Sequence, residues 1–175
     1  MSRVCLLPLS DDNKEAYVKM AINYSKDINS YLDFPSAINP IAITTFANCC
    51  LNGTSPFEID LIYPVCVNIL DCVPIGFIIH SKNVVRSSKY FAYFIDEFYI
   101  SPKYRSKGYG KAAAQKYVFN INQGNVGLFV LQNNKKAAGF WQKVFCDIGY
   151  PLESQLADDK ELDMEKAYLF STLVY

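Results

Sequence analysis

Apolar and polar residues alternate along this chain in two different periods, which predicts a mixed α and β structure. Short apolar runs rich in β-branched and aromatic residues predict strands, whereas apolar positions three or four residues apart behind a capping residue predict helices. The predicted strands are residues 3–9, a segment within 61–70, 73–81, 90–100, 126–131 and 168–174. The predicted helices are residues 11–24, 40–51, 109–119 and 134–145.

The connections between these elements predict the topology of the sheet. The middle strands follow one another closely, with the polar residues 82–88 as a hairpin connection, so they should be antiparallel. The strands around the helix at 109–119 should be parallel, because a helix crosses between them. The predicted fold class is α/β (α+β), with a mixed central sheet of about six to seven strands and helices on both faces. We expect one domain over residues 1–175, and a solvated acidic stretch at 158–165.

Charge and hydropathy exclude several classes of partner. Seventeen basic residues balance 17 acidic ones, so no overall field attracts nucleic acid or an anionic membrane surface. No run approaches the ~18 apolar residues of a membrane-spanning helix. The apolar segment 4–9 is too short for the core of a signal peptide, and Asp11 and Asp12 follow it closely. We therefore expect a cytoplasmic protein without a nucleic-acid or membrane partner.

The cysteine pattern predicts reduced thiols and no metal site. The six cysteines are Cys5, Cys49, Cys50, Cys66, Cys72 and Cys146. They form no C-x-x-C pair, and the single histidine, His80, has no neighbour of ligand type. Free thiols are typical of a cytoplasmic protein. A catalytic pair of His80 with a distant cysteine has no local signature to support it.

A short basic segment with two glycines follows the predicted strand 90–100. It reads Arg105, Ser106, Lys107, Gly108, Tyr109, Gly110. A strand, a glycine-containing loop and a helix start together predict a phosphate cradle, because loop N–H groups and the helix N-terminus attract anions. Glycine lets the backbone approach a ligand closely, and Lys111 adds a further cation. The segment lacks the third glycine of a dinucleotide fingerprint and the ending of a P-loop. In isolation it is equally compatible with a tight turn that has a solvated basic rim.

Residues 98–110 resemble the acetyl-CoA-binding motif of the GNAT family of N-acetyltransferases. This motif has a hydrophobic strand end, a proline, and then a basic glycine loop that opens a helix. A second resemblance to the family lies at 134–141, with an asparagine, alanines and an aromatic pair, one strand further along the chain. The version with Phe140 and Trp141, preceded by Glu97, is similar to a poorly characterised branch of predicted acetyltransferases. The pair Tyr24 and Asp27, three residues apart, also resembles that branch.

The resemblance implies that acetyl-CoA is the cofactor and assigns roles within the two motifs. The backbone of the strand end would pair with the pantetheine arm, the loop would surround the pyrophosphate, and the asparagine would bond the arm. The implied cofactor-binding residues are Phe98, Tyr99, Ile100, Arg105, Ser106, Lys107, Gly108, Tyr109, Gly110, Lys111, Asn134 and Trp141. Asn134 is equally compatible with a plain helix cap, and one side chain can serve both purposes.

Glu97 is the candidate catalytic base. It interrupts a hydrophobic strand just before the cofactor segment, where burial would raise the pKa of its carboxyl group. Strict alternation puts Glu97 on the face opposite Phe98, although a bulge could redirect it. The alternative is a carboxylate on a solvated face of the sheet, and Asp96 and Tyr150 are weaker candidates. Trp141 stands where many family members have a tyrosine acid, and an indole N–H cannot serve as that acid.

These observations predict an acetyl-CoA-dependent N-acetyltransferase. It would transfer an acetyl group to a primary amine by direct attack in a ternary complex and release CoA. Its partner would be an amine-bearing acceptor, either a small molecule or a peptide, and a homodimer is compatible with the sequence. The alternative is a non-catalytic acyl-CoA-binding or regulatory module. A nucleic-acid-binding role for the bases at 103–111 is disfavoured by the neutral overall charge.

Overall fold

A mixed sheet of seven strands forms the centre of the molecule, with the strand order β1-β2-β3-β4-β5-β7-β6. The computed structural model describes residues 4–32, 36–64, 73–121, 123–157 and 167–174. The strands are β1 (Val4–Pro8), β2 (Phe57–Pro64), β3 (Gly76–Arg86), β4 (Lys89–Ile100), β5 (Gly124–Leu131), β6 (Glu153–Leu156) and β7 (Ala167–Val174). The helices are α1 (Lys14–Asn29), α2 (Pro40–Leu51), α3 (Tyr109–Phe119) and α4 (Lys135–Asp147), with a 3₁₀ turn at Pro102–Tyr104.

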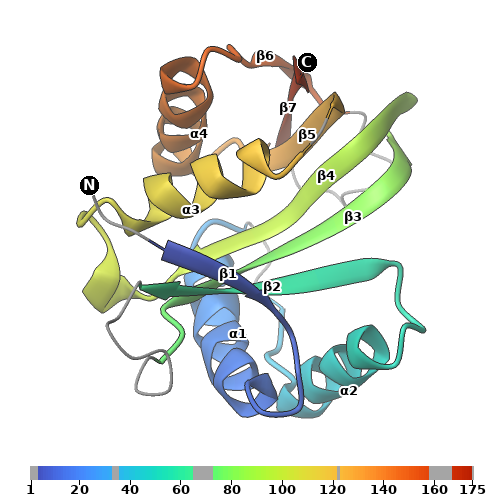
Figure 1. Cartoon of the computed structure of the whole chain (residues 1–175), viewed down its shortest axis with the longest axis vertical. Helices are drawn as coiled ribbons and strands as arrows, with labels where there is room; N and C mark the ends of the chain where they lie inside the picture. The colour runs from blue at the N-terminus through green and yellow to red at the C-terminus, as the bar shows by residue number, and fades with distance from the viewer. Residues whose placement is uncertain (1–3, 33–35, 65–72, 122, 158–166, 175) are drawn as a thin grey trace.

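Helices cover both faces of this sheet, as the sequence predicts. Figure 1 shows α1 and α2 on one side of the strands, and α3 and α4 on the other. The first four strands are antiparallel to one another, β4 and β5 are parallel, and β7 runs antiparallel to both β5 and β6. The predicted parallel pair therefore flanks α3, which crosses between its two strands.

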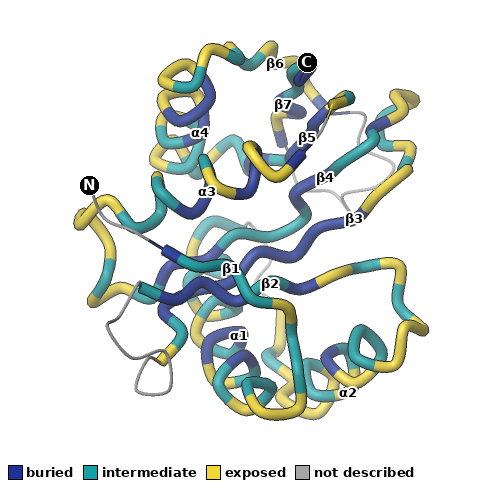
Figure 2. Tube along the Cα trace, viewed as in Figure 1, coloured by how far each residue is buried: buried dark blue, intermediate teal, exposed yellow. Residues whose placement is uncertain are grey.

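Two hydrophobic cores lie on opposite faces of the sheet because successive strand residues point in opposite directions. Leu61 and Phe77 belong to the core beneath α1 and α2, and the adjacent Ile62 and Ile78 belong to the core beneath α3 and α4. All four side chains are fully buried. Figure 2 shows the resulting pattern, with buried positions concentrated along the central strands and on the helix faces turned toward them.

Gly127 allows two aromatic rings to pack closely against β5 where this strand pairs with β4. A Cβ atom at this position would lie 2.6 Å from the ring of Phe91 and 2.9 Å from the ring of Phe94. Both rings are buried. A larger residue would therefore displace them, so this glycine fixes how closely the two strands approach just before they separate.

Several predicted boundaries are wrong. β2 (Phe57–Pro64) begins before the predicted start at residue 61, and the predicted residues 65–70 lie outside the described residues. β3 continues through the predicted hairpin connection to Arg86, and the turn falls at Ser87 and Ser88, which both have positive φ. The polar residues at this end of the hairpin reflect exposure rather than a turn, since Lys82 forms an ion pair with Glu58 on the neighbouring strand.

Two further elements differ from prediction. α1 begins at Lys14 and continues to Asn29, a full turn beyond the predicted end at residue 24. β6 was not predicted, because it is a short edge strand of four exposed residues without an apolar pattern. The predicted acidic stretch at 158–165 lies outside the described residues, as do Cys66, Cys72 and Asn122.

Candidate active site

The parallel strands β4 and β5 pair over a short distance and then separate. Residues 93–95 of β4 face residues 126–128 of β5. Beyond this point β3 is the one partner of β4 among the described strands, from Glu97 opposite Ile79 to Ile100 opposite Gly76. The other edge of this part of β4 therefore faces the opening between the strands, where an extended ligand arm can pair with it as an added strand does.

A tight loop leads from the end of β4 to the N-terminus of α3. Ser106 and Gly108 have positive φ values of 59° and 82°, and Gly108 is the N-cap residue. The first intrahelical bond runs from the N–H of Ala112 to the carbonyl of Gly108 at 3.0 Å. The N–H groups of residues 109–111 precede this bond, so they have no acceptor within the helix and can donate to an anion.

This loop borders a cavity of about 610 Å³ between α1, the end of β4, α3 and α4. Nine of the predicted cofactor residues line it: Phe98, Tyr99, Ile100, Arg105, Ser106, Gly108, Gly110, Lys111 and Asn134. Lys107 and Tyr109 lie in the same loop but outside the lining, and Trp141 lines a second cavity. The structure therefore gathers most of the predicted cofactor residues around one space.

Among the described residues, four basic side chains line this cavity, and two of them were not predicted. Lys136 and Lys143 come from α4, where their spacing of seven residues puts them on one face of the helix. Lys111 donates to Asp147 at 2.7 Å, which ties α3 to the end of α4 and holds the pKa of the Asp147 carboxyl group below its usual value. Basic side chains around a cavity suit a ligand that carries several phosphate groups.

Arg105 is held in place by the first helix. Its Nε donates to the carbonyl of Ile100 at 2.7 Å, and its Nη2 donates to Asp27 of α1. The guanidinium group also lies 5.4 Å from the centre of the Tyr99 ring. The side chain thus fastens the loop to α1 and β4, rather than extending as a mobile cation.

Asn134 and Trp141 occupy the same side of the opening between β4 and β5. The Asn134 side-chain oxygen caps α4 by accepting from the N–H of Ala137 at 3.1 Å, and Asn134 borders both cavities. Trp141 is buried, with its ring centre 5.0 Å from that of Phe98 and 5.1 Å from that of Phe140. Asn134 therefore acts as a helix cap while bordering the cavity, and Trp141 forms part of an aromatic wall.

Glu97 lies just beyond a β-bulge. Ile79 of β3 faces Glu97 and the next residue, His80, faces Ile95, so Asp96 is the extra residue. The bulge puts Asp96 and Glu97 together on the face covered by α1, because Asp96 bonds Ser81 and the partner Ile79 belongs to the core on that face. Glu97 remains on the face opposite Phe98, as strict alternation predicts.

The Glu97 carboxyl group is half-buried and accepts a hydrogen bond from the hydroxyl group of Tyr24 on α1. Burial raises the pKa of Glu97 to about 8. This agrees with the expectation of a raised pKa. A carboxyl group with this pKa can exchange a proton near neutral pH, which general acid–base catalysis requires.

Glu97 borders the second and larger cavity, of about 1080 Å³. This space lies between α1, α2 and the sheet and reaches through the opening between β4 and β5. Five residues line both cavities: Tyr24, Ile28, Phe98, Asn134 and Ala137. The two spaces are therefore contiguous. Tyr24 lies where they meet, and Glu97, to which Tyr24 donates, lines the larger one.

Asp96 is less suited to proton transfer than Glu97. Burial raises the pKa of Asp96, but a hydrogen bond from Ser81 at 2.8 Å and the charge of Arg86 at 3.5 Å oppose the rise. Tyr150, the other weaker candidate, packs against the core beneath α3 and α4 and lines neither cavity.

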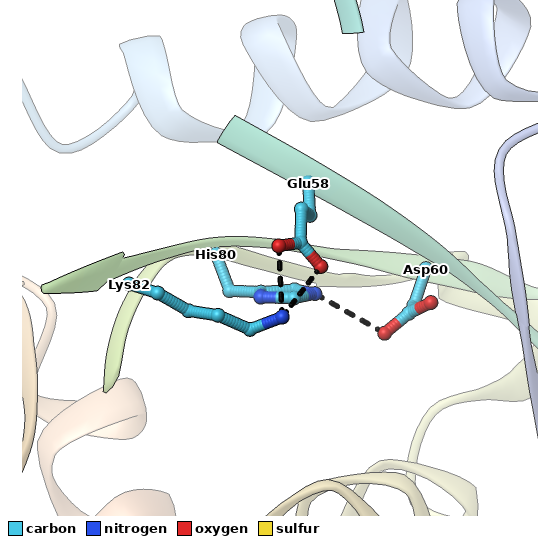
Figure 3. A network of polar contacts seen from close by, with 4 residues as sticks. All are labelled: Glu58, Asp60, His80 and Lys82. Carbon is cyan, nitrogen blue, oxygen red and sulfur yellow. Dashed lines mark hydrogen bonds and ion pairs between the residues drawn. The ribbon is translucent and has the colours of Figure 1, made fainter. Parts of the chain in front are cut away.

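His80 belongs to a separate polar network on the α3 side of the sheet. Figure 3 shows it with Asp60, Glu58 and Lys82, all from β2 and β3. The Nε2 atom lies 3.2 Å from Asp60, and the Lys82 ammonium group lies 2.8 Å from Glu58. The ring is buried against Tyr117 of α3, and His80 lines neither cavity. This environment favours a structural role for His80.

Four residues that shape the site were not assigned to it from the sequence: Tyr24, Asp27, Lys136 and Lys143. In the sequence, Tyr24 and Asp27 show only a resemblance to a family branch, whereas in the structure Tyr24 bonds Glu97 and Asp27 bonds Arg105. The helical spacing of Lys136 and Lys143 would have identified them.

The described parts of the chain contain no group of three or more His, Cys, Asp or Glu residues that could hold a metal ion. Cys5, Cys49, Cys50 and Cys146 are free thiols. No helix in the described ranges is long and apolar enough to cross a membrane.

Comparison with known proteins identifies the family of this site. Residues 55–145, just over half of the chain, match the sequence profile of the acetyltransferase (GNAT) family. This span runs from just before β2 into the last turn of α4 and includes the loop, the bulge and the opening between β4 and β5. No curated protein matches the chain.

Solved structures match over almost the whole chain at low identity. An acetyltransferase from Thermus thermophilus has a TM-score of 0.68 at 11% identity, covering 99% of this chain and 100% of the other. The Vibrio cholerae spermidine N-acetyltransferase, in complex with CoA and spermine, has a TM-score of 0.63 at 12% identity, covering 98% and 95%. Arabidopsis thaliana NAA60, in complex with a bisubstrate analogue, has a TM-score of 0.56 at 16% identity, covering 98% and 99%. At these identities the likeness shows the fold alone.

Proposed function

Because this chain belongs to the acetyltransferase (GNAT) family, we propose that it is an acetyl-CoA-dependent N-acetyltransferase that acts on a primary amine. One observation carries the proposal. A carboxyl group with a pKa of about 8 lines an apolar cavity and accepts a hydrogen bond from Tyr24, which lies where that cavity meets one walled by a glycine loop and basic side chains. This arrangement supports direct transfer between two ligands bound at the same time.

The smaller cavity fits the chemistry of acetyl-CoA, which supplies the acetyl thioester and leaves as CoA. The N–H groups at the start of α3 and the side chains of Lys111, Lys136 and Lys143 would hold phosphate groups. The free edge of β4 would pair with the pantetheine arm. Arg105, held by Asp27, would keep the loop in its binding shape.

Glu97 would act as the general base, directly or through a water molecule. An acceptor amine must lose a proton when its nitrogen forms the new amide bond. With a pKa of about 8, Glu97 is partly ionised near neutral pH and can accept that proton. The same pKa makes the protonated carboxyl group a ready donor for the next step.

Tyr24 is the proton donor best placed for the departing sulfur, because Trp141 has no acidic proton to give. Tyr24 lines both cavities, and its hydroxyl group bonds Glu97. As the carbon–sulfur bond breaks, the Tyr24 hydroxyl proton would pass to the sulfur, and Glu97 would return the proton of the amine to Tyr24. Both side chains then regain their starting protonation states.

The test is release of free thiol from acetyl-CoA in the presence of a panel of amines, with the N-acetyl product identified by mass spectrometry. We expect release that depends on the amine and on the protein. The aromatic packing of Trp141, in place of an acid, favours the non-catalytic acyl-CoA-binding alternative. CoA binding without amine-dependent release would support that alternative and contradict the proposed activity.

A further inference from the structure

The larger cavity has a predominantly apolar and aromatic wall on the side of α1 and α2. Helix residues in this wall are Tyr17, Ala21, Tyr24, Ser25, Ile28, Ala42, Ile43 and Phe46. Strand residues that continue it are Phe57, Phe77 and Ile79. The Ser25 hydroxyl group donates to the carbonyl of Ala21 at 2.9 Å, so its hydrogen is already used within the helix.

The helix at the edge of this cavity is uncharged. α2, from Pro40 to Leu51, contains no Asp, Glu, Lys or Arg, whereas α1 contains charged residues along its length. Ala42, Ile43 and Phe46 of α2 line the cavity. An acceptor that enters beside α2 therefore meets an apolar helix surface that has no side chain to balance a positive charge.

Of the residues that the structure describes, three charged ones line the larger cavity: Arg86, Asp96 and Glu97. Asp96 and Arg86 form an ion pair at 3.5 Å, and Asp96 also accepts from Ser81. Glu97 is therefore the one carboxyl group of this described lining without a cationic partner in it. A second ammonium group against this wall would lack a carboxylate to pair with, which is costly.

We propose that the acceptor is a primary amine carried on an apolar arm, aliphatic or aromatic, with no second positive charge along that arm. This inference rests on the proposed acetyltransferase activity and specifies its acceptor. The amine would lie at Glu97, and the arm would pack between α1, α2 and the sheet. A small alkylamine or arylalkylamine has this chemistry, and so does a peptide N-terminus with an apolar first side chain.

The first experiment compares two acceptors of equal length, hexylamine and hexamethylenediamine, which differ by one terminal ammonium group. We expect kcat/KM for hexylamine to exceed that for the diamine by at least about tenfold, because the diamine brings an unpaired charge against the apolar wall. Phenethylamine should behave like hexylamine, and spermidine like the diamine. Equal or faster acetylation of the diamine or of spermidine would overturn the inference.

A second experiment distinguishes the two kinds of acceptor that share this chemistry, a peptide N-terminus and a small amine. Two short peptides, identical except for Phe or Asp at the first position, are compared with phenethylamine. Preference for the Phe peptide over the Asp peptide and over phenethylamine assigns the arm to a peptide N-terminus, and preference for phenethylamine assigns it to a small amine. Preference for the Asp peptide over both would contradict an apolar arm.

A matched pair of variants tests the wall itself. Ala42→Glu adds a carboxylate to the cavity lining, in the first turn of α2 where an acidic residue is favourable for a helix. Ile41→Glu adds the same charge one residue earlier, at a side chain that is 78% exposed and outside the lining. We expect Ala42→Glu to reduce the preference for hexylamine over the diamine at least about threefold and Ile41→Glu to leave it unchanged. Equal effects of both variants would contradict the proposed path of the arm.

Failure of the inference and failure of the proposed function have different signatures. Turnover that favours charged acceptors overturns the inference alone. If CoA binds and no amine is acetylated, the proposed activity fails, and calorimetry of hexylamine and of the diamine on the CoA-bound protein then decides the inference. Tighter binding of hexylamine supports the apolar arm, and equal or tighter binding of the diamine overturns it.

Discussion

The two cavities meet at the opening between β4 and β5, and their walls differ in chemistry. The smaller cavity is formed by a backbone loop, a helix N-terminus and basic side chains. The larger cavity is formed mostly by apolar side chains of α1, α2 and the sheet, with Glu97 in its lining and Tyr24 at the point where the two spaces meet. The smaller cavity suits a phosphorylated ligand, which N–H groups and cations bind, and we propose that the larger one holds an amine on an apolar arm beside one proton acceptor.

The comparison shows that one strand, β4, borders both cavities. β4 presents its free edge to the smaller cavity, and beyond the bulge it presents the Glu97 side chain to the larger one. α1 links both regions, because Tyr24 bonds Glu97 and Asp27 bonds Arg105. A change in either region should therefore affect one ligand strongly and the other weakly.

The largest expected effect is on the cofactor region. Gly108→Val should reduce the affinity for CoA at least about a hundredfold, measured by isothermal titration calorimetry. Gly108 has a φ of 82°, which a β-branched residue adopts only with strain, and the added side chain would occupy the loop beside the N-terminus of α3. The native protein should gain about 2.7 kcal/mol of stability at a hundredfold excess of CoA over its Kd, and the variant should gain almost none.

Gly53→Val is the control for backbone strain. Gly53 also has a positive φ, of 66°, but it has open space around it and lines neither cavity. Both variants should lose stability to a similar extent, and only Gly108→Val should lose CoA binding. Normal CoA affinity in a folded Gly108→Val protein would show that the phosphate groups bind elsewhere in the chain.

A smaller effect is expected where the two regions meet. Tyr24→Phe removes the hydroxyl group that donates to Glu97, which should raise the pKa of Glu97 above about 8, because the carboxylate loses a stabilising bond. Activity at pH 7 should fall roughly tenfold with CoA affinity retained. Recovery at high pH would assign Tyr24 to tuning Glu97, and a loss that persists would assign it to the departing sulfur.

Tyr90→Phe is the control for removal of a hydroxyl group. It removes a bond to Asn83 at the other end of β4, far along the strand from the site. An identical pH–rate profile for Tyr24→Phe and the native protein would contradict a role of Tyr24 in proton transfer.

The pH dependence of the stability of the protein should also reveal the raised pKa of Glu97. The folded-state pKa of Glu97, about 8, lies above the unfolded value, so folding favours the protonated form and this contribution is lost as pH rises from about 4.3 through 8. Glu97→Gln should therefore gain stability relative to the native protein over this range, by at most about 1.4 kcal/mol per pH unit. Thermal unfolding at pH 5 and pH 9 measures the difference, and a constant difference would show that Glu97 is not protonated on folding.

The smallest effect is expected at the aromatic wall. Trp141→Phe should raise the KM for acetyl-CoA by no more than about threefold and leave kcat nearly unchanged, because Trp141 packs and has no proton to give. Phe145→Leu, in the same cluster but outside both linings, should lower stability without changing KM. A large loss of kcat in Trp141→Phe with normal CoA affinity would instead indicate that the catalytic groups lie around Trp141.

The cofactor region could be predicted from the sequence better than the acceptor region, for a physical reason. A loop that binds phosphate with its backbone requires glycine at set positions, so Gly108 and the helix start after it stand out in the sequence. The strand end and the cap at Asn134 are local features as well. Nine of the predicted cofactor residues accordingly line one cavity.

The acceptor region depends on contacts between distant segments, which leave no local pattern. Tyr24 and Glu97 are 73 residues apart, and Asp27 and Arg105 are 78 apart. The bulge at Asp96 and the extension of β3 to Arg86 are set by pairing between strands rather than by composition. Neither the apolar wall nor the roles of Tyr24 and Asp27 could therefore be derived before the fold was known.

The central claim is that Glu97 accepts the proton of an amine bound in the apolar cavity. The most direct test compares the pH dependence of kcat/KM for the native protein and Glu97→Gln, with a fluorinated alkylamine that is already neutral at pH 6 as acceptor. We predict a rate that rises through a pKa near 8 in the native protein, and a lower rate without this rise in Glu97→Gln. The same rise with the same midpoint in both proteins would contradict the claim.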